Sequence, residues 1–226
     1  MIDLDPAGAP EGTARVQADI SDRAQVDRAV GGCADALGGI DVVVNNAGVS
    51  AVGDVTTNDD AEWARVLSVN VTAIARVSAA ALPHLRASEH AAIVNMSSIA
   101  ATAGLQERAL YSATKGAVQA MTMAMATDHL ADSIRVNCVN PGTVATEFVD
   151  RMLQNFPDPV AERKALDARQ PTGRMVTPQE VAETVVFLAS PLNTSTTGTS
   201  LAVDGGMHGL RARPRPASTS NQESRT

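Results

Sequence analysis

A tyrosine and a lysine four residues apart, Tyr111 and Lys115, have the spacing in this sequence that most directly suggests chemistry. On a helix, that spacing places both side chains on one face. An ammonium group beside a phenol favours the phenolate and lowers the phenol pKa from its usual value of about 10. A tyrosine in that setting can act as an acid or base near neutral pH. Alone, the pair is also typical of an ordinary helix surface.

Polar or glycine-rich segments follow three apolar runs of the chain. They are Asn45–Gly48 after residues 40–44, Ser97 and Ser98 after residues 91–96, and Pro141–Thr146 after residues 133–139. Each one alone is typical of a strand-to-loop turn. If the runs are parallel strands, their carboxyl ends lie at one edge of a sheet, which is where open α/β sheets bind ligands. The three segments together therefore indicate a binding site.

The elements that would hold these residues alternate between strand and helix. We expect strands at 14–18, 40–44, 91–96, 133–139 and 199–203, with the middle three buried on both faces. We expect helices at 22–37, capped by Ser21 and ended by Gly38-Gly39, at 59–87, at 109–131, and after a capping box of Thr177 and Glu180. This order predicts an α/β fold with a doubly wound parallel sheet and helices on both faces.

Composition excludes several classes of function. The 226 residues are 44% hydrophobic and carry a net charge of −7, which favours a globular domain without nucleic-acid or anionic-lipid partners. No uninterrupted apolar run of about 18 residues suggests a membrane span, and the N-terminus is unlike a signal peptide. Cys33 and Cys138 fit buried thiols in a reducing, cytoplasmic setting better than a disulfide or a metal site.

Taken together, the motifs resemble the short-chain dehydrogenase/reductase family from residue 1 to about residue 207. The resemblance rests on Asn45–Gly48, Asn70, Ser98, Tyr111, Lys115, Pro141-Gly142 and Asp204–Gly206. It implies a Rossmann-like domain over residues 1–208, followed by a polar tail at 209–226 that we expect to be disordered. It also implies a homotetramer or homodimer, with helices 59–87 and 109–131 packing against other subunits.

The resemblance assigns roles to individual residues. Tyr111 becomes the general acid/base, Ser98 binds the reacting oxygen, Lys115 lowers the tyrosine pKa and holds the nicotinamide ribose, and Asn70 positions a water in a proton relay. The remaining cofactor contacts that it implies are Asn46, Ala47, Gly48, Pro141, Gly142, Val144 and Thr146.

The acids near the N-terminus bear on the choice of dinucleotide. Asp3 looks like the residue that binds the adenosine ribose and repels a 2′-phosphate, which favours NAD over NADP. Asp5 is an alternative for that role. Asp19 and Ile20 resemble the position that contacts adenine, although Asp19 also fits a helix-capping carboxylate.

One departure from the family pattern is large. The family's first strand, its glycine-rich phosphate loop and its first helix have no counterpart in this sequence. We therefore expect a chain that begins late, through a start-codon assignment or as a fragment, that binds NAD poorly and tends to aggregate. A naturally truncated relative without cofactor is the alternative.

Arginines suggest the substrate class. Arg108 lies three residues before Tyr111, Arg151 lies in the variable segment that covers the substrate in the family, and Arg169 follows that segment. They resemble arginines of the cytosolic hydroxybutyrate and sugar-acid dehydrogenase branch, and arginine suits carboxylates. The resemblance thus implies NAD-linked interconversion of a secondary alcohol and a ketone, on a hydroxy or keto acid substrate. The alternative is an inactive relative that serves only in subunit association.

Overall fold

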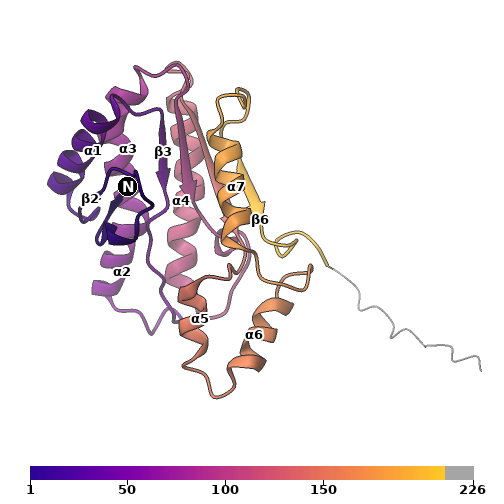
Figure 1. The fold of residues 1–226 in the computed structure, drawn as a ribbon. Coiled ribbons are helices and arrows are strands. Elements are labelled where there is room, and N and C mark those ends of the chain that lie inside the picture. The colour runs from indigo at the N-terminus through magenta and orange to yellow at the C-terminus, as the bar shows by residue number, and fades with distance from the viewer. Residues whose placement is uncertain (212–226) are drawn as a thin grey trace, which may run out of the picture.

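The computed structural model describes residues 1–211, so most of the tail predicted to be disordered lies outside the described residues. The strands are β1 (Ile2–Asp3), β2 (Val16–Gln17), β3 (Val42–Asn45), β4 (Ala92–Met96), β5 (Arg135–Pro141) and β6 (Ser200–Val203). The helices are α1 (Arg23–Leu37), α2 (Asp60–Leu67), α3 (Ala73–Leu85), α4 (Ala109–Asp128), α5 (Glu147–Leu153), α6 (Pro159–Ala168) and α7 (Pro178–Ala189) (Figure 1).

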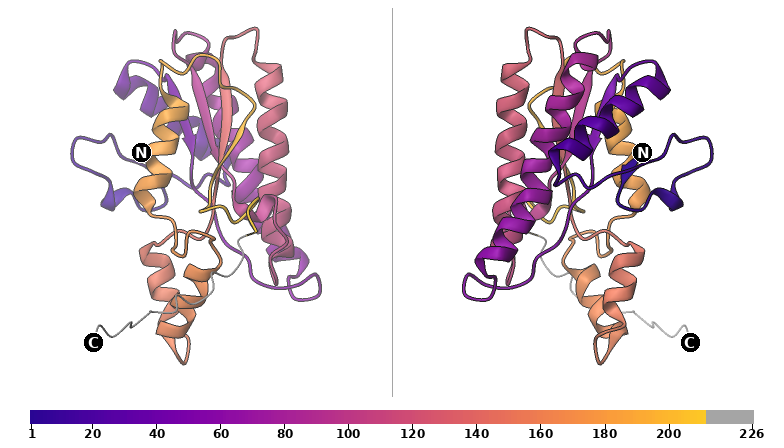
Figure 2. Two further views of the ribbon diagram at one scale, coloured as in Figure 1. Left: turned by 90° about the vertical axis from the view of Figure 1, so that its right-hand side faces the viewer. Right: turned by 90° about the vertical axis from the view of Figure 1, so that its left-hand side faces the viewer.

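All paired strands run parallel, as the alternating pattern predicted. Strands β3, β4, β5 and β6 form one sheet in that order, and β1 pairs with β2 in a separate two-stranded sheet. Helices α4 and α7 lie on opposite faces of the larger sheet (Figure 2). The architecture is therefore the predicted α/β fold with helices on both faces.

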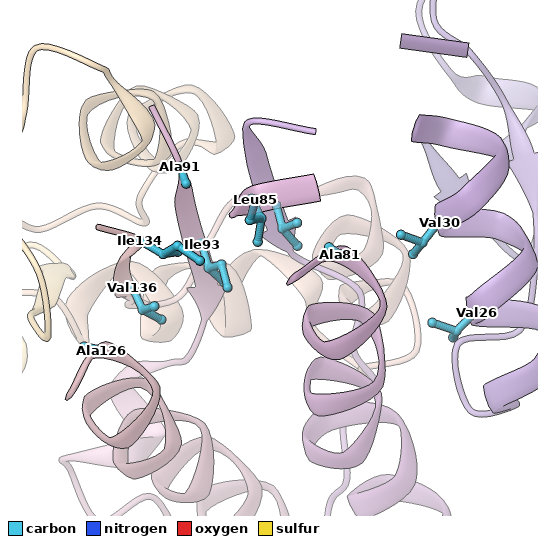
Figure 3. Close-up of a cluster of buried hydrophobic side chains, with 10 residues drawn as sticks. Val26, Val30, Ala81, Leu85, Ala91, Ile93, Ala126, Ile134 and Val136 are labelled. Carbon is cyan, nitrogen blue, oxygen red and sulfur yellow. The ribbon is translucent and has the colours of Figure 1, made fainter. Parts of the chain in front are cut away.

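The main hydrophobic core lies between the sheet and the layer formed by α1, α3 and α4. Figure 3 shows Val26 and Val30 of α1 pointing toward Ala81 of α3, with Leu85 and Ile93 beyond them. These side chains are buried, and their burial fixes the helix layer against the strands. A second cluster, built around Val94, Val139 and Leu188, packs α7 on the other face.

Two local predictions are wrong. The cap of α1 is Asp22, whose side chain accepts a hydrogen bond from the Gln25 amide at 3.0 Å, and not Ser21. Strand β3 is not buried on both faces, because Val42 and Val44 are 37% and 44% exposed. The predicted end of α1 at Gly38 and the capping box of Thr177 and Glu180 are confirmed.

The edge of β3 opposite β4 pairs with no strand among residues 1–211. The main-chain oxygen of Asp41 accepts a bond from Ala92 of β4. Because main-chain groups alternate in direction along a strand, those of Val42 and Val44 point away from β4. An apolar cavity of about 440 Å³ lies beside this edge and extends to β1. An unpaired apolar edge is a surface on which other chains can add strands.

We predict that Val42→Lys lowers the rate of self-association about twofold or more, because edge lysines oppose strand addition. Light scattering at matched protein concentrations measures the rate. Val160→Lys on α6 is the matched control, since Val160 is exposed but lies outside the sheet. Equal rates for the two variants would contradict the role of the edge.

The helical run from Asp60 to Leu85 has no uninterrupted apolar stretch of about 18 residues, but by overall length and composition it is long and apolar enough to cross a membrane. Core helices of globular domains pass the same test. Here the π-helical turn Ser68–Thr72 divides the run, and Asn70 and Ser78 are buried polar residues within it. The Asn70 side chain donates to the Val49 oxygen, and Ser78 accepts from the Asn45 side chain at the end of β3. These bonds attach the helical run to β3 and to the loop that follows it.

Candidate active site

The four residues to which the resemblance assigns catalytic roles meet at the edge formed by the carboxyl ends of the strands. We call this set, Asn70, Ser98, Tyr111 and Lys115, the tetrad. Ser98 follows β4, Tyr111 and Lys115 lie in the first two turns of α4, and Asn70 lies in the π-helical turn between α2 and α3. Helices α5 and α6 project beyond this same end of the sheet (Figures 1 and 2). The fold thus gathers residues from three segments of the chain in one place.

Tyr111 is partly buried, in a cluster with Val49, Ala51 and Trp63. Burial raises the pKa of its phenol above 10, while interaction with the Ser98 hydroxyl and the charge of Arg108 oppose that rise. The net direction differs from the predicted lowering of the Tyr111 pKa, because desolvation disfavours the phenolate.

Lys115 is buried beneath the tyrosine. Its Nζ donates a hydrogen bond to the main-chain oxygen of Met96 at 2.8 Å and lies 5.7 Å from the centroid of the Tyr111 ring. Burial lowers the pKa of Lys115 from 10.5 to about 8. The lysine therefore changes its charge close to physiological pH.

Asn70 has its amide fully engaged. Its Oδ1 accepts from the Val49 amide at 2.8 Å, and its Nδ2 donates to the Val49 oxygen at 2.9 Å and to Thr114 Oγ1 at 3.1 Å. The side chain thus holds the loop after β3 against α4. Because every proton of the Asn70 amide already has a partner, the side chain is better suited to positioning than to proton transfer.

Sequence reasoning missed two hydroxyls at this edge. Ser97 Oγ donates to the main-chain oxygen of Lys115 at 2.8 Å, and Thr114 accepts from Asn70. Ser97 was noticed only as part of the Ser97-Ser98 pair. Thr114 precedes Lys115 directly and follows Tyr111 by three residues, so its helical spacing could have indicated contact with the same face.

Several candidate cofactor residues share the apolar cavity between β1 and β3. Asp3, Ile20, Asn46 and Ala47 all line it. Gly48 lies next to it, where a Cβ would sit 3.2 Å from Asn70 Oδ1 and 3.7 Å from Lys115 Nζ. The loop after β3 therefore links the cavity to the tetrad.

The acids at this end of the chain make local bonds. Asp3 Oδ1 accepts from the Asp5 amide, and Asp5 caps the short helical turn Pro6–Gly8. Asp19 Oδ1 accepts from the Ser21 amide, so it stabilises the turn before α1 without capping the helix itself. Of these three acids, only Asp3 lines the cavity.

The loop Pro141–Thr146 packs tightly on the turn after β6. A Cβ at Gly142 would lie 3.0 Å from the Asp204 Cα, so only glycine fits there without a shift. Val144 forms a bridge with Val176, and Thr146 caps α5 by accepting from the Val149 amide. This loop is thereby held at the site edge, at the start of the α5–α6 segment.

The three candidate substrate arginines lie in different settings. Arg108 Nη1 donates to the Ala51 oxygen at 2.9 Å and to Ser50 Oγ at 3.3 Å, at the start of α4. Arg151 on α5 and Arg169 after α6 are exposed. Within residues 1–211, no hydrogen bond or ion pair joins Arg151 or Arg169 to the tetrad. The structure thus places only Arg108 beside Tyr111.

The chemistry available at this edge is transfer of a proton at a partly buried phenol. Across the described part of the chain, no three His, Cys, Asp or Glu side chains cluster as metal ligands would. The side chains that converge are a phenol, two hydroxyls, an ammonium and an amide. Such a set can bind a hydroxyl or carbonyl oxygen and exchange one proton with it.

Comparison with known proteins relates the whole site to a family. The family model described as enoyl-(acyl carrier protein) reductase matches residues 4–208. An inactive 2-(S)-hydroxypropyl-CoM dehydrogenase 2 of Xanthobacter autotrophicus is 40% identical over 215 residues, which cover 92% of this chain and 93% of the relative. A cis-4-hydroxycyclohexanecarboxylate dehydrogenase of Sinomonas cyclohexanicum is 38% identical, over 84% of this chain and 75% of the relative.

Solved structures of similar fold point to the same family. The 3-ketoacyl-(acyl-carrier-protein) reductase of Brucella melitensis, complexed with NADH, superimposes with a TM-score of 0.82 at 31% identity, over 92% of this chain and 86% of that one. ElxO with NADP bound gives a TM-score of 0.80 at 29% identity, over 86% of this chain and 77% of that one. The chain belongs to the short-chain dehydrogenase/reductase family of NAD(P)-dependent oxidoreductases, whose members act on small-molecule alcohols and ketones.

Proposed function

We propose that this chain interconverts a secondary alcohol and a ketone by hydride transfer to or from NAD, with a hydroxy or keto acid as substrate. The observation that carries the proposal is the convergence of Asn70, Ser98, Tyr111 and Lys115 at the carboxyl edge of the sheet. Of these, Tyr111 is the group that exchanges the proton.

Each residue would have a distinct task. In the oxidation direction, the Tyr111 phenolate takes the proton of the substrate hydroxyl, while the Ser98 hydroxyl donates a hydrogen bond to the same oxygen. Lys115 supplies positive charge next to the phenolate. Asn70 keeps the loop after β3 in place. In the reduction direction, the Tyr111 phenol returns the proton to the carbonyl oxygen.

The residues around Tyr111 and Lys115 are suited to binding the ribose of the nicotinamide half of the dinucleotide. Gly48 leaves open the space beside Lys115 Nζ that a Cβ would narrow, and the ammonium is a donor for ribose hydroxyls. Asn46, Ala47 and the loop Pro141–Thr146, with Gly142, Val144 and Thr146, would line the nicotinamide side. When bound, the nicotinamide would supply or accept the hydride. Asp3, Asp19 and Ile20 would face the adenosine end.

We predict that Asp3→Ser relaxes the preference for NAD over NADP about tenfold, measured as the ratio of kcat/KM values. A carboxylate about 4 Å from a 2′-phosphate in water costs about 1 kcal/mol for each unit of phosphate charge. Asp5→Ser is the matched control, since Asp5 does not line the cavity. An unchanged ratio in Asp3→Ser, or an equal change in Asp5→Ser, would contradict the assignment.

A carboxylate substrate is supported by Arg108 and by the hydroxycarboxylate named for one relative. Arg151 and Arg169 would reach the substrate only if α5 and α6 close over the site. The test is reduced-nicotinamide formation with a panel of 2- and 3-hydroxy acids, each paired with its neutral amide. Faster turnover of the acids, lost in Arg108→Met, supports the proposal. Equal turnover of acid and amide would overturn it.

The second candidate is a relative without catalytic activity. The observation that favours it is the 40% identical relative named as inactive, which matches this chain over 93% of its own length. In that case no substrate of the panel would give reduced nicotinamide above a Tyr111→Phe blank. Subunit association would then be the remaining role.

We further propose a homotetramer or homodimer in the cytoplasm. Its subunits would associate through the helical run of α2 and α3, predicted at 59–87, and through α4, predicted at 109–131. The support is that α4 exposes Met123, and that Leu130 just beyond it is exposed as well. A molar mass from light scattering that equals one chain at micromolar concentration would contradict association.

A further inference from the structure

The geometry points to Thr114 as a positioning residue: its hydroxyl joins Asn70 to the main chain of Tyr111 and so holds the partly buried tyrosine ring between α4 and the loop after β3. This inference concerns the site of the proposed function and rests on it for its catalytic meaning. Its test reads the environment of the phenol directly and does not need turnover.

Thr114 is fully buried, and its hydroxyl both accepts and donates a hydrogen bond. Oγ1 accepts the Asn70 Nδ2 proton at 3.1 Å and donates its own proton to the Tyr111 main-chain oxygen at 2.8 Å. Asn70 in turn holds both main-chain groups of Val49. The chain of bonds therefore runs from the loop after β3, through the π-helical turn, to the residue that carries the phenol.

Val49 is also part of the apolar cluster around the Tyr111 ring, with Ala51 and Trp63. Removing the Thr114 hydroxyl leaves one Asn70 N–H buried without an acceptor. A buried donor without a partner is unfavourable, and admitting water between the loop and α4 satisfies it. That water would reach the edge of the phenol and partly reverse the burial that raises the Tyr111 pKa.

The experiment uses a property of this chain. Tyr111 is its only tyrosine, so the rise of phenolate absorbance with pH reports one residue. We expect Thr114→Val to move the titration midpoint of Tyr111 down by about half a pH unit or more, and Thr114→Ser to restore it. Tyr111→Phe gives the blank, and fluorescence of the single tryptophan, Trp63, shows over which pH range each variant remains folded.

Thr122 provides the matched control. It is equally buried on the same helix, accepts the Asn95 amide at 2.9 Å and donates to the Val118 oxygen at 2.8 Å. We expect Thr122→Val to lose comparable stability without moving the Tyr111 midpoint. A midpoint that stays in place or rises in folded Thr114→Val, or one that shifts equally in Thr122→Val, would overturn the inference. Because no turnover is measured, neither result depends on whether the proposed function is correct.

Discussion

Replacement of Tyr111 by phenylalanine is expected to lower the turnover rate by about 10²–10⁴-fold, which is what a general acid/base contributes. Phenylalanine keeps the ring that packs against Val49 and Trp63 and removes only the hydroxyl. The fold is therefore expected to persist while the proton exchange is lost. Initial rates at saturating dinucleotide, with the best substrate of the panel, measure the effect.

Dinucleotide affinity serves as the internal control for this variant. The phenol carries the proton but is a minor anchor for the cofactor, so the dissociation constant for NAD is expected to change less than about threefold. A Tyr111→Phe variant that keeps more than about a tenth of the rate would contradict the assignment of Tyr111 as the acid/base. Loss of binding in parallel with rate would indicate a disturbed site.

The positions of the main strands and of helix α4 could be predicted because their signals are local. The apolar run at 91–96 gave β4, the Thr177 capping box gave the start of α7, and the Tyr111–Lys115 spacing gave one face of α4. The meeting of Asn70 with Tyr111 required the family resemblance, since no spacing rule connects positions separated by a strand and a loop.

Other features depend on packing, which no short pattern reports. The Tyr111 pKa was expected to fall because Lys115 is close in sequence, yet burial in the folded site raises it. The exposure of Val42 and Val44 depends on which elements cover their face of β3, which periodicity does not specify. Thr114 was missed because a threonine within a helix is common and carries no signal of its own. Only the folded structure shows that its hydroxyl accepts from Asn70.

Lys115 is expected to lower the free energy of unfolding of the protein. Its pKa falls from 10.5 to about 8 in the fold because burial disfavours the ammonium. Such a difference corresponds to about 3 kcal/mol at pH values where the lysine is charged in both states. Lys115→Met removes that cost but also the bond to the Met96 oxygen, which contributes about 1 kcal/mol. We therefore expect a net gain of about 2 kcal/mol at pH 7.

The sign of the pH dependence follows from the two pKa values. Below about pH 8 the lysine is protonated in both the folded and the unfolded chain, so its cost is constant. Between about pH 8 and 10.5 the unfolded chain binds more protons, and the free energy of unfolding rises with pH. Tyr111 acts in the opposite direction only above pH 10, since its pKa is raised in the fold. Burial also raises the pKa of the Cys138 thiol from 9.0, so this thiol opposes Lys115 from about pH 9 upward. The window from about pH 8 to 9 therefore isolates Lys115.

Urea unfolding at pH 7 and at pH 9 measures both effects. The unmodified chain is expected to gain stability between these two pH values, whereas Lys115→Met is expected to start higher, lack this gain and have lost turnover. Lys164→Met is the matched control, because Lys164 is the other lysine of the chain and is exposed on α6. A Lys115→Met variant less stable than the unmodified chain at pH 7 would show that the ammonium contributes more through its contacts than its burial costs. Greater stability together with lost turnover would show that the site keeps a buried charge for its chemistry, at the expense of the fold.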